Sequence, residues 1–365
     1  MHLAKAISVD ESVLIPQSVY VKKLRPLLPA EAFEPDASKL VVLFINLGIL
    51  IIGWAIAAHL DHLPIYFLWL YLPLALIMGN SIITLLFSTH DLMHGSVIKK
   101  SRWNYIISFL GLSMLFMPPT QWKTLHNLVH HNHTNALTDP DRSYLYQQPN
   151  TWGKRIQNLF VPSSEVHPFW LAIGMAGSWV VHDFRNLTSV LFFNGQLVDY
   201  VPSAFTVSKK DRLIIAFELV GIMAIHLSIL AYLRFDPLKI AFVYLLPIAI
   251  GHAGSMFYIY TNHFLCRMTS VNDPLINSLS LRVPKVVDWL HLHFSYHTEH
   301  HIFPSLNSDY YPLVQELIQT HYPERMNLLD AGEAWHLLMT TPRHYQDEVS
   351  LTDSLGKTSV GCPYQ

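Results

Sequence analysis

Residues 65–94 read IYFLWLYLPLALIMGNSIITLLFSTHDLMH, a mainly apolar run that ends in two histidines. The part from Ile65 to Phe87 contains no charged residue and is long enough for a helix that crosses a bilayer, which takes roughly 20 residues. His90 and His94 follow four positions apart, so both imidazoles lie on one face of a continuing helix. This stretch therefore predicts a transmembrane helix that presents a pair of imidazoles beyond one end.

Three further runs have the same length and character: Leu40–Ala58, Leu213–Leu233 and Ile240–Tyr260. The four runs form two pairs, joined by the short connections His59–Pro64 and Arg234–Lys239. A short connection between two spans predicts a hairpin that crosses the membrane and returns. The sequence thus predicts an all-α integral membrane protein with four transmembrane helices in two hairpins.

The rest of the chain divides around these spans. Two shorter apolar runs, Tyr105–Met117 and Phe169–Val181, cover about half a bilayer in helical rise and suit re-entrant or interfacial segments. We expect a cytoplasmic N-terminal segment over 1–39, a membrane domain with a cytoplasmic helical cap over 40–342, and a loosely ordered polar tail over 343–365.

Composition agrees with a membrane protein. The 365 residues are 51% hydrophobic and 14% charged, and the mean hydropathy is +0.27, which is too apolar for an ordinary soluble enzyme. A net charge of -2 without a block of Lys and Arg excludes nucleic acid as a partner. Two cysteines, Cys266 and Cys362, are too few for a disulfide framework or a four-thiolate cluster, which fits a reduced compartment. The first 39 residues lack the order of a cleaved signal.

Three histidine clusters follow or precede the spans. The first ends at His94 after the second span, the second (His126 to His131) precedes the third span, and the last (His297 to His301) follows the fourth. With two hairpins, all three clusters and both termini share one side of the membrane. Basic residues on that side predict a cytoplasmic face, against a mild counter-signal from Arg234 and Lys239. These residues are Lys99, Lys100, Arg102, Lys123, Lys209, Lys210 and Arg212.

The clusters are too dense in histidine to be accidental. Histidine makes up 22 of 365 residues, so 16 residues should hold about one, whereas the 16 residues of the clusters hold eight. The eight are His90, His94, His126, His130, His131, His297, His300 and His301. Spacings of three and four place imidazoles on neighbouring helical turns, where two can hold one ion, so each cluster resembles a chelate.

Eight nitrogen ligands exceed the four of a tetrahedral site and the six of an octahedral one, so the count favours two metal ions. Imidazole alone does not identify the metal, since zinc, copper, nickel and iron all accept it. Lone histidines such as His226 and His252 are expected to have packing roles. Other candidates for the site or its surroundings are Asn262, His263, His133, His291, His293, Asp139 and Asp141, the two carboxylates being suited to orient imidazoles.

The pattern His90-xxx-His94, His126-xxx-His130-His131 and His297-xx-His300-His301, on one side of four spans, resembles the three histidine boxes of the membrane fatty acid desaturase superfamily. The resemblance covers residues 40 to about 305 and includes flanking residues such as Gly95, Asn135 and Pro304. It implies a centre of two iron ions, with His263 as a further ligand, Asn262 near a metal-bound water and O₂ as co-substrate.

Departures from the family pattern indicate which subgroup of the family the chain resembles. The five-residue first box is similar to the acyl-lipid type rather than to acyl-CoA desaturases. The third box begins with His297 instead of glutamine, and no His-Pro-Gly-Gly haem motif is present, so fused cytochrome b5 enzymes are disfavoured. A separate electron donor, such as a ferredoxin or cytochrome b5, is therefore implied. The segment from Tyr260 to Phe264 lacks the Glu-His motif of alkane hydroxylases.

The resemblance implies O₂-dependent oxidation of an unactivated C–H bond in a fatty acyl chain, with desaturation to an alkene as the majority reaction. The substrate is lipid-linked, carrier-linked or free, and hydroxylation or oxidative decarboxylation to a 1-alkene by the same site stays open. A metal transporter is the alternative of another class, with Glu218, His226 and His252 as intramembrane candidates. A carboxylate di-iron bundle would need paired Glu-xx-His motifs, and only Glu333-Ala-Trp-His336 fits.

Overall fold

The computed structural model describes residues 14–62, 64–99, 102–136, 138–140, 161–193 and 206–364. Within these ranges four helices are long and apolar enough to cross a membrane. They extend over Ala37–His59, Tyr66–His94, Lys209–Tyr232 and Pro237–His263, and they confirm the four runs predicted from the sequence. The second and fourth helices continue past the predicted spans, and each ends on a histidine of the candidate site.

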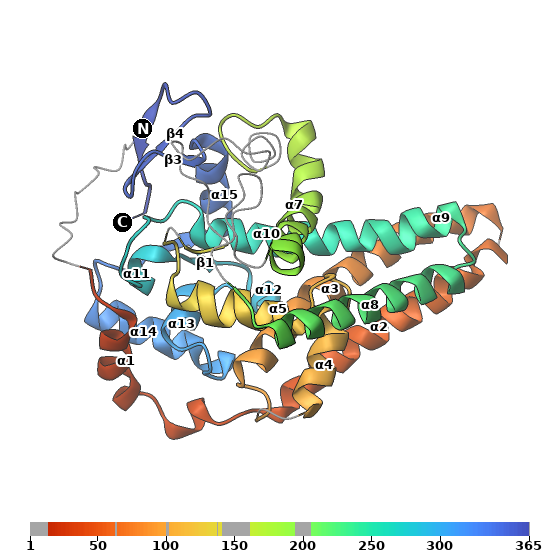
Figure 1. Ribbon diagram of the computed structural model, residues 1–365, viewed down its shortest axis with the longest axis horizontal. Helices are drawn as coiled ribbons and strands as arrows, with labels where there is room; N and C mark the ends of the chain where they lie inside the picture. The colour runs from red at the N-terminus through yellow and green to blue at the C-terminus, as the bar shows by residue number, and fades with distance from the viewer. Residues whose placement is uncertain are drawn as a thin grey trace.

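The described chain is mostly helical (Figure 1). The regular parts of the four long helices are α2 (Leu40–His59), α3 (Tyr71–His94), α8 (Lys209–Tyr232) and α10 (Leu246–His263), and two helices of intermediate length are α4 (Arg102–Ser113) and α7 (Pro168–Thr188). The shorter helices are α1 (Gln17–Leu24), α5 (Pro119–Trp122), α9 (Pro237–Lys239), α11 (Pro274–Asn277), α12 (Lys285–Leu290), α13 (His297–Ile302), α14 (Tyr311–His321) and α15 (Ala331–Thr340).

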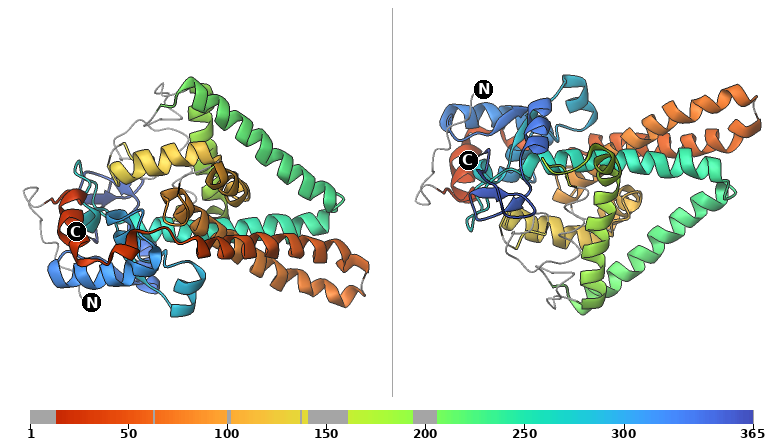
Figure 2. Two further views of the ribbon diagram at one scale, coloured as in Figure 1. Left: turned by 90° about the horizontal axis from the view of Figure 1, so that it is seen from below. Right: turned by 90° about the horizontal axis from the view of Figure 1, so that it is seen from above.

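The long helices extend together from one end of the molecule, with α9 at their tip, and most of the other short helices and both small sheets gather at the other end, which we call the body (Figures 1 and 2). Helix α3 packs between α2 and α10. Two glycines make the contact of α3 with α10 close: a Cβ on Gly79 would lie 2.5 Å from Ile250, and one on Gly251 would lie 2.5 Å from Ile82. Small residues that let helix backbones approach are typical of packing between membrane helices.

The two shorter apolar runs form helices that are absent from the four candidate spans. The first corresponds to α4 and a turn in which Phe116 has a left-handed φ of 57°. The second is longer than predicted, because α7 continues to Thr188. All three views show α7 running across the direction of the long helices, at the junction with the body.

The N-terminal segment is part of the body. Tyr20, Leu24 and Ala32 are buried in a core shared with α13 and α14. The side-chain amide of Gln17 donates to the carbonyl oxygen of His301 at 2.7 Å. Residues before the first span therefore lie against the third histidine cluster.

The tail after residue 342 is ordered, which corrects the sequence prediction. Strands β3 (His344–Tyr345), β4 (Ser350–Thr352) and β5 (Ser359–Gly361) form an antiparallel sheet, and β1 (Ser280–Arg282) pairs in parallel with β2 (Leu328–Asp330). The Tyr345 hydroxyl donates to the carbonyl oxygen of Cys266 at 2.5 Å. Strands this short show no alternating pattern in a polar sequence, so the prediction missed them.

Candidate metal centre

Nine histidines converge near the C-terminal ends of α3 and α10, which are His94 and His263. They form two groups, and within each group the candidate ligand atoms all lie within 4.8 Å of one another. The five-histidine group contains His90, His94, His126, His131 and His300, and the four-histidine group contains His130, His263, His297 and His301. These are the nine residues expected as metal ligands, and the structure brings all of them together. Their role as ligands remains a prediction.

Local helix geometry divides the second cluster between the groups. Residues Lys123–Val129 form a wide π-type helical turn, and a tight 3-10 turn over His130–Asn132 follows. Because the helical pitch changes between them, the three imidazoles do not share one face. His126 and His131 belong to the five-histidine group, whereas His130 belongs to the four-histidine group.

The third cluster is also divided. On α13, His297 and His301 are four residues apart and belong to the four-histidine group, while His300 belongs to the other. Only the first cluster, at the end of α3, stays together. The spacing alone predicted that each cluster would chelate one ion, whereas each group in the structure draws on more than one cluster.

The imidazole nitrogens point toward one another within each group. In the five-histidine group, His131 Nε2 lies 3.2 Å from His126 Nε2 and 3.0 Å from His300 Nε2. In the four-histidine group, His297 Nε2 lies 2.6 Å from His263 Nε2 and 3.1 Å from His301 Nε2. Metal–nitrogen bonds of about 2.0–2.1 Å place adjacent ligands of one ion about 3 Å apart, so this spacing fits metal coordination.

The protonation state of the site also fits a metal. Burial, reinforced by neighbouring imidazoles, lowers the pKa of His131, His297, His300 and His301 well below the ordinary value. These rings are therefore neutral near pH 7, and a neutral imidazole offers a lone pair to a cation. Buried His90 Nε2 has no hydrogen-bond partner among the described residues. An all-nitrogen donor set suits iron as well as zinc, copper or nickel.

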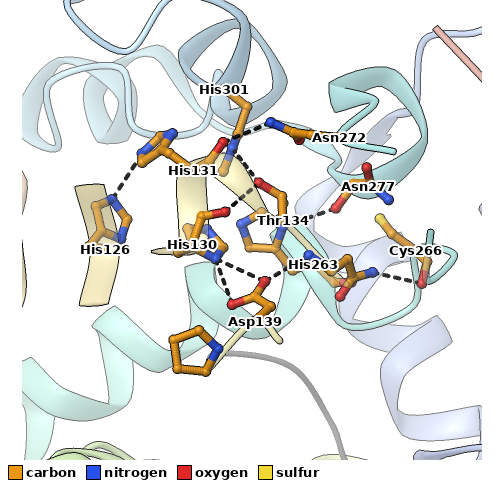
Figure 3. Close-up of polar contacts among 12 residues, drawn as sticks. His126, His130, His131, Thr134, Asp139, His263, Cys266, Asn272, Asn277 and His301 are labelled. Atoms are coloured by element: carbon orange, nitrogen blue, oxygen red, sulfur yellow. Dashed lines mark hydrogen bonds and ion pairs between the residues drawn. The ribbon is translucent and has the colours of Figure 1, made fainter. Parts of the chain in front are cut away.

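The four-histidine group is held from outside by polar contacts (Figure 3). His130 Nδ1 donates to Asp139 Oδ2 at 3.0 Å, and the backbone N–H of Asn135 donates to the same oxygen at 2.7 Å. His263 Nδ1 donates to the carbonyl oxygen of Asn277 at 3.1 Å. Such partners fix the tautomer that leaves Nε2 available for a metal.

The five-histidine group has a longer chain of support. His90 Nδ1 lies 3.3 Å from Asp91 Oδ1, and Asp91 Oδ2 accepts a hydrogen bond from the Ser308 hydroxyl at 2.9 Å. The Lys39 ammonium in turn donates to Ser308 Oγ at 2.6 Å. His300 Nδ1 lies 3.1 Å from the Tyr311 hydroxyl. A buried cation from the N-terminal segment thus reaches the candidate ligand His90 through two intermediate side chains.

Asn262 occupies a distinctive position beside the four-histidine group. It is fully buried on α10, next in sequence to His263, and neither its side-chain oxygen nor its nitrogen has a hydrogen-bond partner among the described residues. A buried amide without a partner is costly unless a water or ligand satisfies it. A metal-bound water near Asn262 would satisfy this amide, and that contact stays a prediction.

Other candidates lie outside the two groups. His133 is exposed, and His291 bonds to Tyr258 at 2.9 Å and to Asn80 at 3.2 Å. His293 belongs to neither group. Asp141 lies outside the described residues.

Sequence reasoning missed several supporting residues. Asp91 lies inside the first cluster and could have been noted as a carboxylate next to His90. Lys39, Asn277 and Tyr311 had no signal, because each reaches the site only through the fold. Glu299, between His297 and His300, was also missed; burial raises its pKa to about 7 although Ser280 and Gln315 donate hydrogen bonds to it.

Comparison with known proteins identifies the family of this chain. The family model described as fatty acid desaturase matches residues 37–329. The chain therefore belongs to the fatty acid desaturase family. The match covers the four long helices and all nine histidines of the two groups.

Individual relatives are more distant. The chain is 29% identical over 174 residues to the sn-1 oleoyl-lipid 12-desaturase of Anabaena variabilis, covering 45% of each chain. It is 33% identical over 112 residues to a Synechocystis protein of the same name, covering 30% of each. It is 23% identical over 249 residues to fatty acid desaturase 3 of Bos taurus, covering 64% of this chain and 52% of the relative. The chain thus spans about half or less of these relatives' length.

Proposed function

We propose that this chain is a membrane desaturase that uses two iron ions and O₂ to convert a C–C single bond of a fatty acyl chain to a double bond. The observation that carries the proposal is the pair of buried groups of converging neutral imidazoles in a chain of this family. An unactivated methylene offers no acidic proton and no electrophilic carbon, so general acid–base and nucleophilic catalysis have nothing to act on.

Two bound irons would supply the oxidising power. In the overall balance, one hydrogen atom is removed from each of two adjacent methylenes, and O₂ is reduced to two waters by these two hydrogen atoms, two external electrons and two protons. The histidines of the two groups would hold the irons, and Asp139, Asp91 and the Asn277 carbonyl orient the imidazoles. Burial of the four-histidine group excludes water, which protects a strong oxidant from side reactions.

The substrate we propose is an acyl chain attached to a membrane lipid. Two relatives are named sn-1 oleoyl-lipid 12-desaturases, and the first box has the acyl-lipid spacing. We further propose that the long helices form two hairpins with the histidine groups, the helical cap and both termini on the cytoplasmic side. A separate ferredoxin or cytochrome b5 would deliver the electrons there. Hydroxylation and oxidative decarboxylation remain alternative outcomes of the same site.

A metal transporter is less well supported. Two of the three intramembrane candidates have other partners: Glu218 accepts hydrogen bonds from Tyr105 and Thr120, and His226 bonds to the Ser113 carbonyl and to Tyr244. Among the described residues, none of the three belongs to a group with metal-ligand spacing. A transport pathway would need ligands along the spans rather than beyond them.

Expression of the chain in a host that makes saturated and monounsaturated lipids tests the proposal. Gas chromatography of lipids, free acids and hydrocarbons should reveal a new alkene in acyl chains, absent with His297→Ala. A new alcohol or 1-alkene would instead identify one of the alternative reactions. An unchanged profile with altered metal uptake would contradict the proposal and favour transport.

A further inference from the structure

Helix α7 has an apolar face turned outward. Phe169, Ile173, Val180 and Phe184 are between 45% and 61% exposed. Their spacing of four, seven and four residues places them on one stripe of the helix. A helix on the surface of a soluble protein has the opposite arrangement, with its apolar stripe facing the core.

The inward face of α7 carries polar groups. Asp183 is buried and accepts a hydrogen bond from the Gln121 side chain at 3.1 Å, and burial raises the pKa of its carboxyl well above the ordinary value. Trp179 is buried beside it and donates to the Leu115 carbonyl oxygen at 2.7 Å. Helix α7 thus bonds to polar partners inside the protein and exposes apolar side chains on its outer face, which fits lipid surroundings.

The depth of α7 follows from its contact with α10. The Trp179 ring lies 6.1 Å from the ring of His252. About 20 helical residues cross the hydrocarbon core, so a span counted from Pro237 reaches the other boundary near Met256. His252 lies about one turn short of that point. Helix α7, which runs across the long helices, therefore meets α10 within about one turn of the membrane boundary.

Helix α12 meets the same boundary independently. Its C-terminal residue Leu290 accepts a hydrogen bond from the Thr84 hydroxyl of α3 at 3.2 Å. A span of about 20 residues counted from Tyr66 ends near Leu85, next to Thr84. Trp289 on α12 is 72% exposed and Val286 is 61% exposed. Figure 2 shows α7 and α12 on opposite sides of the long helices.

We propose that α7 and α12 lie in the boundary between headgroups and acyl chains of the bilayer, as two lipid-binding surfaces on opposite sides of the helix bundle. In this placement Trp170 and Trp289, which are 43% and 72% exposed, lie at the depth where tryptophan is enriched in membrane proteins. The inference rests on the proposal that the long helices span a bilayer, and it does not depend on the chemistry at the metal centre.

The plane set by α7 and α12 has a consequence for the substrate. His263 follows His252 by 11 residues, a rise of about 16 Å along α10. The candidate centre therefore lies outside the hydrocarbon core, and the acyl chain has to leave the bilayer to reach it. Both surfaces are close to the centre along the chain: Gln121, which bonds to Asp183 of α7, precedes His126 by five residues, and α12 ends seven residues before His297.

Tryptophan fluorescence of the full chain in phospholipid nanodiscs tests the placement. Three conservative variants, Trp170→Phe, Trp289→Phe and Trp179→Phe, identify each residue's contribution by difference from the wild-type spectrum. Trp179 is a matched control on the same helix, since it is 4% exposed whereas Trp170 is 43% exposed. Trp69, exposed near the far end of the spans, reports through Trp69→Phe whether those helices are in lipid at all.

Phospholipids brominated near the ester group should abolish most of the Trp170 and Trp289 emission and leave Trp179 unchanged. Three results would overturn the placement of the helix concerned. Its tryptophan could be quenched by aqueous iodide instead, it could be quenched by bromine near the acyl terminus, or it could be quenched by none of these reagents. If Trp69 is quenched by brominated lipid while Trp170 and Trp289 are not, this inference fails and the membrane proposal stands. If none of the three is quenched, both fail.

Discussion

The two histidine groups differ in ligand count and in exposure. All four imidazoles of the four-histidine group are buried, whereas His94 and His126 of the five-histidine group are half-buried. The five-histidine group therefore has the more exposed imidazole rings, although the buried Trp122 ring stacks on His126 with 4.5 Å between the ring centroids. The four-histidine group has one ligand fewer and lies beside the unpartnered Asn262 amide, which leaves room for a non-protein ligand.

The carboxylates that contact the imidazoles from outside also differ between the two groups. The Asp139 carboxylate contacts His130 with both oxygens, at 3.0 and 3.1 Å, and is buried. The Asp91 contact with His90 is longer, at 3.3 Å, and Asp91 is shared with Ser308. We infer that the four-histidine group is the more rigid of the two and that the five-histidine group is the one that exchanges metal and solvent.

Removing one ligand from either group should have the largest effect. His131→Ala opens the five-histidine group and His297→Ala opens the four-histidine group, and each should reduce the desaturated product below detection, because the proposed chemistry needs both irons. Iron per chain should fall from about two to about one in each variant. Product formation by either variant at a wild-type rate would refute the assignment of that group.

Removing an orienting carboxylate should have the next largest effect. Asp139→Asn leaves His130 with a neutral partner, and loss of such a partner typically lowers metal affinity or activity about 10- to 100-fold. Asp91→Asn is the matched change in the other group and should have a smaller effect, since its contact is longer. Equal affinity losses, measured by iron titration of the apoprotein, would contradict the difference between the groups.

Chelator treatment should remove the two irons at different rates. The half-buried ligands His94 and His126 give a chelator access to the five-histidine group, so iron loss should occur in a fast and a slow phase of similar amplitude. In His131→Ala, which retains only the four-histidine group intact, the slow phase should remain. A single phase in the wild-type protein would show that the difference in exposure does not govern exchange.

The smallest effect is expected from the most distant group. Lys39→Met removes the ammonium that bonds Ser308, and a hydrogen bond of about 1 kcal/mol corresponds to about a five-fold loss of iron affinity in the five-histidine group. Lys39→Arg keeps a donor and should retain more of the affinity. Titration of His297→Ala protein with cobalt, followed by absorption, measures the change in the metal affinity of this group without any catalytic assay.

The spans and the eight box histidines were predictable because both leave local marks in the sequence, whereas His263 was expected as a ligand only through the family resemblance. Apolar length alone identifies α2, α3, α8 and α10, and spacing identifies the eight box histidines. The division of the second cluster was not predictable, because it depends on a change of helical pitch at His130. The contacts of Lys39, Asn277 and Tyr311 are set by packing between segments far apart in the chain. The tail sheet was missed because its strands are two or three residues long.

We propose that the two groups hold one iron each. Elemental analysis of wild-type protein, purified in nanodiscs after growth in iron-rich medium, tests it most directly. We expect close to two irons per chain in the wild-type protein and about one in both His131→Ala and His297→Ala. A single metal ion per chain, zinc in place of iron, or an iron content that neither substitution changes would contradict it.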